Sequence, residues 1–110
     1  ILSNINAEGN KMKNMILVTL LMTIGMSSAY AAPPAKEMVC RTCHGEGGAK
    51  SLIPSYPKLN GQNKEYLIGS LNAYKKGDRK GGMAGLMTAQ VSMLSDAEIE
   101  ELAAYYSSQP

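Results

Sequence analysis

The 110-residue sequence contains no phenylalanine and no tryptophan, and it has only two cysteines and one histidine. Phenylalanine and tryptophan bury the most apolar area per side chain, so the chain lacks the usual large contributors to a hydrophobic core. Two cysteines exclude a scaffold of several disulfides and a four-cysteine zinc site. A single histidine excludes catalytic schemes that need two imidazoles. These counts leave few residues that could bind a metal or act as catalytic groups.

An excess of one charge is also missing, because 11 Lys and Arg face 9 Asp and Glu, for a formal net charge of +2. Nucleic-acid binding needs a basic patch or a ladder of aromatic side chains, so no nucleic-acid partner is predicted. The one basic cluster is Lys75–Lys80, with the sequence KKGDRK. A solvated loop is the preferred interpretation of this cluster, and a docking site for an acidic partner protein is the alternative.

Residues 12–31 have the organisation of a secretory signal peptide. Lys13 precedes the apolar run Met15–Met26, and Ala29-Tyr30-Ala31 supplies small residues for cleavage. As a helix the run spans roughly 18 Å, against about 30 Å of hydrocarbon core, so an uncleaved membrane anchor is the weaker alternative. Residues 1–11 show no pattern, and we expect translation to begin at Met12. The sequence therefore predicts an exported protein with one mature domain, residues 32–110.

The mature domain is predicted to be all-α, with three helices. The first covers residues 35–44 and follows two prolines, which suit a helix start. The second covers 64–76, with Asn63 as its N-cap and apolar residues on one face. The third covers 95–107 and begins with an S-x-x-E capping box followed by apolar residues at helical spacing.

Two long segments between the predicted helices are rich in Gly and Pro and are predicted to be loops. They are residues 45–62 and 77–85. Loops of this length in a small domain are usually functional, or are held by a group that is not part of the chain.

Nearly all of the recognisable chemistry lies in Cys40-Arg41-Thr42-Cys43-His44, a C-x-x-C-H motif. Positions three apart share one face of a helix, so both thiols point the same way and the imidazole follows directly. This arrangement lets the thiols add to the two vinyl groups of a haem while the histidine reaches the iron, and it is typical of c-type haem attachment. The alternatives are a thioredoxin-like thiol pair, part of a zinc site or a small disulfide. The first needs a βαβ surround and the second needs more thiolates.

The chain resembles the small class I c-type cytochromes of bacteria, both the single-haem proteins and each half of the di-haem ones. The resemblance extends from residue 35 to 109 and implies the class I cytochrome c fold, with three main helices and long loops wrapped around one covalent haem c. Its marks follow the family's order: Cys40-x-x-Cys43-His44-Gly45, Pro54-x-Tyr56-Pro57-x-Leu59-x-Gly61-Gln62, Tyr66, Met87, Leu94-Ser95-Asp96 and Leu102-Ala103-Ala104-Tyr105-Tyr106.

The resemblance also implies which residues bind the iron. His44 is one axial ligand and, because the chain has no other histidine, a methionine thioether is the candidate for the opposite face. Met83, Met87 and Met93 all lie between the last two predicted helices. The family's spacing before the last helix favours Met87, with Met83 next and Met93 last.

Two further expectations come from the resemblance. A proline carbonyl should accept a hydrogen bond from Nδ1 of His44, which orients the ring, and Pro54 suits this role better than Pro57. The family's first helix is usually longer and carries a glycine that meets an aromatic residue of the last helix. The first helix here is short, and we expect Tyr105 or Tyr106 to pack across it.

Together these features predict a one-electron carrier of the periplasm that does not span the membrane after signal cleavage. Iron bound by both His44 and Met87 leaves no position for a substrate, so no enzymatic activity is predicted. The partners would be redox proteins, met by a monomer or in a transient complex. One alternative is a cytochrome subunit of a periplasmic oxidoreductase. Others are a five-coordinate haem sensor, in which Met87 does not bind iron, and a haem-free thiol-redox domain.

Overall fold

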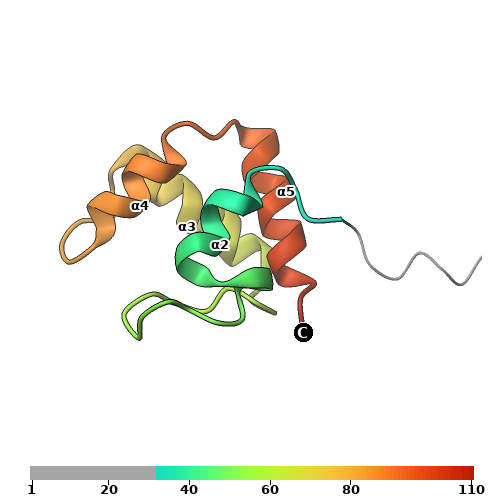
Figure 1. Ribbon diagram of the computed structural model, residues 1–110. Helices are drawn as coiled ribbons and strands as arrows, with labels where there is room; N and C mark the ends of the chain where they lie inside the picture. Colours follow the sequence, from blue (N-terminus) through green and yellow to red (C-terminus); the bar gives the residue numbers. More distant parts are fainter. Residues whose placement is uncertain (1–31) are drawn as a thin grey trace, which may run out of the picture. The chain divides into compact units, whose positions relative to one another are not determined.

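A computed structural model of the protein describes residues 32–110, which are helical and contain no strand. The elements in chain order are α2 (Glu37–His44), the 3₁₀ turn η1 (Glu46–Gly48), α3 (Lys64–Lys76), α4 (Ala84–Val91) and α5 (Asp96–Ser107) (Figure 1). None of these helices is long and apolar enough to cross a membrane. The all-α prediction is confirmed. The signal peptide predicted at 12–31 and the extension 1–11 lie outside the described residues.

Helix α2 is shorter than predicted because a turn precedes it. The backbone N–H of Glu37 donates to the carbonyl of Pro34 at 3.0 Å, so residues 35 and 36 belong to this turn and helical bonds begin after it. The helix ends at Gly45, whose φ of 81° suits glycine and whose N–H donates to the carbonyl of Arg41. The C-x-x-C-H motif therefore occupies the last five residues of the helix.

The ends of α3 and α5 agree with the predicted caps. The side chain of Asn63 accepts a hydrogen bond from the N–H of Tyr66, and Gly77 ends α3 in the left-handed conformation. The predicted capping box is present as well. The hydroxyl of Ser95 accepts from the N–H of Glu98 at 3.1 Å, and the N–H of Ser95 donates to the Glu98 carboxylate at 3.0 Å.

Helix α4 is absent from the sequence prediction, which places only three helices in the domain. Its eight residues, AGLMTAQV, include a glycine and show little segregation of polar from apolar positions. The N-terminal end carries no side-chain cap, so the N-cap signal that identifies α3 and α5 is missing here. Helix α4 packs against α3, and tertiary contacts rather than local sequence account for its helical state.

The core is small and lies mainly between α3, α5 and the segment that joins α4 to α5. α3 contacts both α4 and α5, while α2 continues into η1, which contacts α5 (Figure 1). Cys40, Leu59 and Met87 pack against the core from outside. The buried apolar side chains of the described residues are Leu67, Val91, Leu94, Ile99, Leu102, Ala103 and Tyr106.

Hydrogen bonds attach the long loop between η1 and α3 to η1, to α5 and to the C-terminal residue. The N–H of Leu59 donates to the carbonyl of Gly48 at 2.8 Å, and the N–H of Gly61 donates to the carbonyl of Tyr106 at 2.9 Å. The side-chain amide of Asn60 donates to the carbonyl of Pro110 at 2.7 Å. These bonds fix the path of the loop and bring its middle residues over the end of α2.

Candidate haem-binding site

Helix α2 presents the two cysteines and the histidine predicted to bind haem. Cys40 and Cys43 are free thiols and each is partly buried. His44, the last residue of the helix, keeps only 5% of its surface exposed. The helix therefore places two unpaired thiols three residues apart, immediately followed by a buried imidazole.

A backbone carbonyl fixes the orientation of that imidazole. Nδ1 of His44 lies 2.7 Å from the carbonyl oxygen of Pro57. A carbonyl can only accept, so Nδ1 carries the hydrogen and donates. In the neutral ring, Nε2 then carries the lone pair and is free to bind a metal. The Tyr56 ring lies next to the imidazole, with centroids 6.3 Å apart.

The prediction that Pro54 supplies this carbonyl is wrong, because Pro57 does. Pro54 is the second residue of a tight turn that the N–H of Tyr56 closes by donating to the carbonyl of Ile53 at 3.1 Å. Proline favours this position because its fixed φ matches the turn. The chain reverses through the turn and returns to the ring of His44 three residues later. In the sequence, the turn-forming residues Ile-Pro-Ser-Tyr are the one signal that Pro54 belongs to a turn.

A buried carboxylate with its arginine partner and a tyrosine lie close to Cys40. The carboxylate of Glu37 is fully buried, and one of its oxygens accepts from Nε and Nη2 of Arg41 at 2.7 and 2.6 Å. Burial raises the pKa of the Cys40 thiol, the neighbouring Tyr106 side chain opposes the rise, and the Glu37 carboxylate adds to it. Burial likewise raises the pKa of Tyr106. Tyr106 thus meets α2 at Cys40, as expected for one of the two tyrosines.

The three candidate methionines differ in exposure. Met87 lies on α4, is partly buried and packs against the core. Met83 is 45% exposed, and its sulfur accepts a weak hydrogen bond from the hydroxyl of Ser55 at 3.7 Å. Met93 is 76% exposed. Burial therefore ranks Met87 first, Met83 second and Met93 last, which is the order of preference given by the sequence analysis.

The donor set fits a covalently attached haem. Two thiols at C-x-x-C spacing supply the atoms for two thioether bonds, and the adjacent imidazole has its Nδ1 hydrogen already paired. A domain with so few large buried side chains would gain core from a porphyrin. These features define the class of the protein as a c-type haem protein built on an all-helical domain.

Comparison with known proteins gives the family. The family model for cytochrome c matches residues 34–109, and the chain belongs to the cytochrome c family. It is 51% identical to cytochrome c-554(548) of Halomonas halodenitrificans over 79 residues, which cover 72% of this chain and 94% of that protein. It is 41% identical to cytochrome c4 of Stutzerimonas stutzeri over 108 residues, 87% of this chain and 51% of the relative.

A more distant relative is the thiosulfate dehydrogenase electron acceptor of Stutzerimonas stutzeri, 37% identical over 67 residues, which cover 61% of this chain and 31% of that protein. The chain thus spans nearly the whole of one relative but only about half of cytochrome c4. The predicted resemblance and fold class are confirmed, and the cofactor is covalent haem c. The protein is an electron carrier that exchanges electrons with redox partners.

Proposed function

We propose that the protein is a periplasmic one-electron carrier whose haem iron is bound by His44 and Met87. Haem c supplies an iron that takes up and releases a single electron. The observation that carries this proposal is the 2.7 Å hydrogen bond between Nδ1 of His44 and the carbonyl of Pro57, beside two free thiols. It prepares Nε2 as a ligand before any metal binds.

The residues of the chain have separate roles in this proposal. Cys40 and Cys43 hold the cofactor covalently, so it cannot dissociate. The carbonyl of Pro57 orients the His44 ring and raises its basicity as a ligand. The Met87 thioether favours the reduced iron and gives a high reduction potential. If His44 and Met87 both bind the iron, no open position would remain for a substrate, and the iron would exchange electrons without a change of ligands.

Two observations support Met87 as the second ligand. Met87 is the partly buried candidate and packs on the core beside Val91, one helical turn away. The alternatives are less suited, because Met93 is largely exposed and Met83 is engaged by Ser55. The signal-peptide pattern of residues 12–31 supports export, and covalent attachment of c-type haem takes place outside the cytoplasm.

Addition of carbon monoxide to the reduced, haem-loaded protein tests the carrier against the sensor. A thioether on the iron blocks this gas, so the wild-type visible spectrum is expected not to change at neutral pH. Met87→Ala opens the position and serves as the positive control, because it should bind carbon monoxide at once. Binding by the wild type to the same extent as Met87→Ala would favour the five-coordinate sensor and contradict the proposal.

A second candidate is an electron acceptor dedicated to one dehydrogenase, and the similarity to the thiosulfate dehydrogenase electron acceptor favours it. The test mixes the oxidised protein with a thiosulfate dehydrogenase and thiosulfate and follows haem reduction. A dedicated acceptor should be reduced at least roughly tenfold faster than an unrelated cytochrome of matched potential. Equal rates would leave the general carrier as the function.

A further inference from the structure

The segment that carries Met87 has few polar attachments to the rest of the domain. Helix α4 follows Gly81 and Gly82, has no side-chain cap at its N-terminal end and is only eight residues long. An isolated helix of this length is unstable in water. Within residues 32–110, two side-chain hydrogen bonds join residues 81–94 to other elements. One is the weak contact of Ser55 with the Met83 sulfur, and the other comes from Lys75.

Lys75 lies in the last turn of α3 and reaches across to the exit of the Met87 segment. Its ammonium donates to the carbonyl oxygen of Leu94 at 2.5 Å, and a third of its side chain remains exposed. The nearest carboxylate oxygen, from Asp96, is 3.9 Å away and belongs to a side chain that is 94% exposed. The strong interaction of Lys75 is therefore the charged hydrogen bond to a backbone carbonyl.

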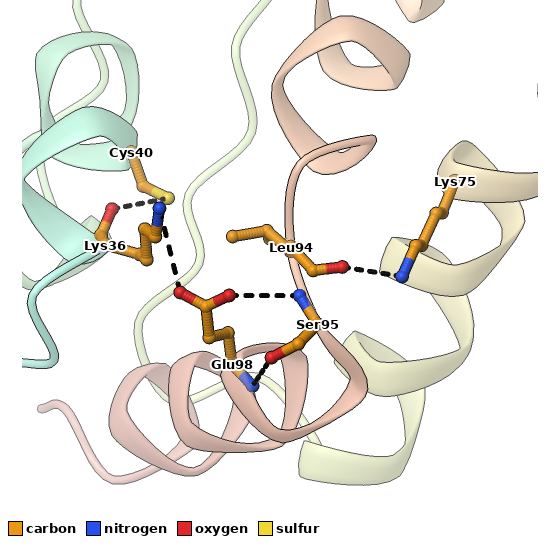
Figure 2. Close-up of polar contacts among 6 residues, drawn as sticks. All are labelled: Lys36, Cys40, Lys75, Leu94, Ser95 and Glu98. Carbon is orange, nitrogen blue, oxygen red and sulfur yellow. Dashed lines mark hydrogen bonds and ion pairs between the residues drawn. The ribbon is translucent and has the colours of Figure 1, made fainter.

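Figure 2 shows that this bond lies where several elements meet. Leu94 immediately precedes Ser95, which begins the capping box of α5. The Glu98 carboxylate of that box also approaches the ammonium of Lys36, next to α2, at 3.8 Å. The capping box and Lys36 thus hold the start of α5, and the hydrogen bond from Lys75 connects the preceding residue, Leu94, to α3.

Leu94 is linked in turn to Met87 through α4. The N–H of Leu94 donates to the carbonyl of Val91 at 3.0 Å, and both side chains are in the core. Val91 lies four residues after Met87, so the two share one face of α4. A displacement of Leu94 therefore moves the end of the helix on which Met87 is carried.

We propose that Lys75 is a positioning residue for the Met87 thioether. Its hydrogen bond to the Leu94 carbonyl holds the end of α4 against α3, so that the thioether stays on the iron and resists displacement by other ligands. This inference rests on the proposed ligation by His44 and Met87. Without the ammonium, the Leu94 carbonyl loses its partner, the segment opens more often and the iron is more accessible.

The test uses the oxidised, haem-loaded protein and imidazole as the competing ligand, followed at the long-wavelength absorption band of a thioether–iron bond. Lys75→Met is expected to bind imidazole roughly three- to tenfold more tightly than wild type. Lys75→Gln, whose side chain is too short to reach, should behave in the same way and replaces it if Lys75→Met does not fold. Lys75→Arg retains a charged donor and should restore most of the wild-type resistance.

Two variants separate positioning from a general effect of charge. Lys76→Met removes the neighbouring charge, and the side chain of Lys76 makes no hydrogen bond or ion pair within the described part of the chain. Asp96→Asn removes only the distant carboxylate. Both should bind imidazole as the wild type does. Wild-type imidazole affinity in Lys75→Met and Lys75→Gln, or an equal rise in Lys76→Met, would overturn the inference.

The parent proposal fails in a different way. If Met87→Ala keeps the long-wavelength band, Met87 is not the ligand, whatever the Lys75 variants do. If Met87→Ala loses the band and the Lys75 variants bind imidazole as wild type does, only the role of Lys75 is rejected. Global unfolding in guanidinium chloride, measured on the same samples, shows whether a change is confined to the Met87 segment.

Discussion

Gly48 lies where η1 packs closely against the loop that carries Pro57 and against Tyr106 of α5. Its φ is +70°, and a Cβ atom there would lie 2.7 Å from Cβ of Leu59 and 3.0 Å from a ring carbon of Tyr106. Its carbonyl also accepts the N–H of Leu59, which closes the loop that carries Pro57. A side chain at this position would therefore push the loop away from α5 and from the imidazole.

Gly48→Ala should lower the free energy of unfolding by roughly 3 kcal/mol, because left-handed backbone strain and overpacking add. Gly77→Ala is the matched control. Gly77 has a similar φ of +75° with nothing within 4 Å of the added Cβ, so strain alone should cost about 1 kcal/mol. Guanidinium chloride unfolding of the haem-loaded variants measures both. Equal losses would mean that contact with Leu59 and Tyr106 does not matter.

Single residues also mark how far the sequence predicts the site. Cys40, Cys43 and His44 could be identified because the chemistry depends on their spacing along one helix. The identity of the carbonyl on His44 could not, because it depends on the path of a loop. Pro54 belongs to a tight turn. Pro57 is brought to the ring by the loop, which is held by hydrogen bonds from Leu59 to Gly48 and from Gly61 to Tyr106 at the end of α5.

At the scale of elements, local capping decides what could be predicted. α3 and α5 have side-chain caps that the sequence displays, and their bounds agree with the prediction to within one residue. α4 has no side-chain N-cap and contains a glycine, so its sequence shows no helix start that would distinguish it from a loop. Its helical state depends on packing against α3, which a single sequence does not reveal.

Ser95→Ala tests the capping box of α5. The variant leaves the N–H of Glu98 without its hydroxyl acceptor, so the free energy of unfolding should fall by about 1 kcal/mol. Ser70→Ala, inside α3, is the control and should cost nothing or stabilise slightly, since alanine is the better helix former. Denaturant unfolding of both variants gives the comparison. A loss no larger than in Ser70→Ala would show that the box contributes little.

At the scale of the whole molecule, the small apolar core makes stability depend on the cofactor. Tyr106 is the only aromatic residue among the buried apolar side chains of residues 32–110. Small domains with little buried surface usually need a metal, a disulfide or another added group. Covalent haem c fills that role here, so cofactor attachment and folding should be coupled.

The double variant Cys40→Ala/Cys43→Ala removes both attachment points. Produced without bound haem, it is expected to lose the cooperative thermal transition and much of its helical circular dichroism. Cys43→Ala keeps one thioether bond and should retain a folded, coloured protein with a lower midpoint. A haem-free double variant that unfolds cooperatively near the wild-type temperature would show that the polypeptide core suffices.

The most direct test is the absorption spectrum of the native oxidised protein, combined with extraction of a parallel sample by acidified acetone, which removes any haem that is not covalently attached. Covalent haem bound by His44 and Met87 predicts that colour stays with the extracted chain and that the native protein shows the weak long-wavelength band of a thioether–iron bond. That band should disappear in Met87→Ala and persist in Met83→Ala and Met93→Ala. Loss of all haem on extraction, or a band that survives Met87→Ala, would contradict covalent haem bound by His44 and Met87.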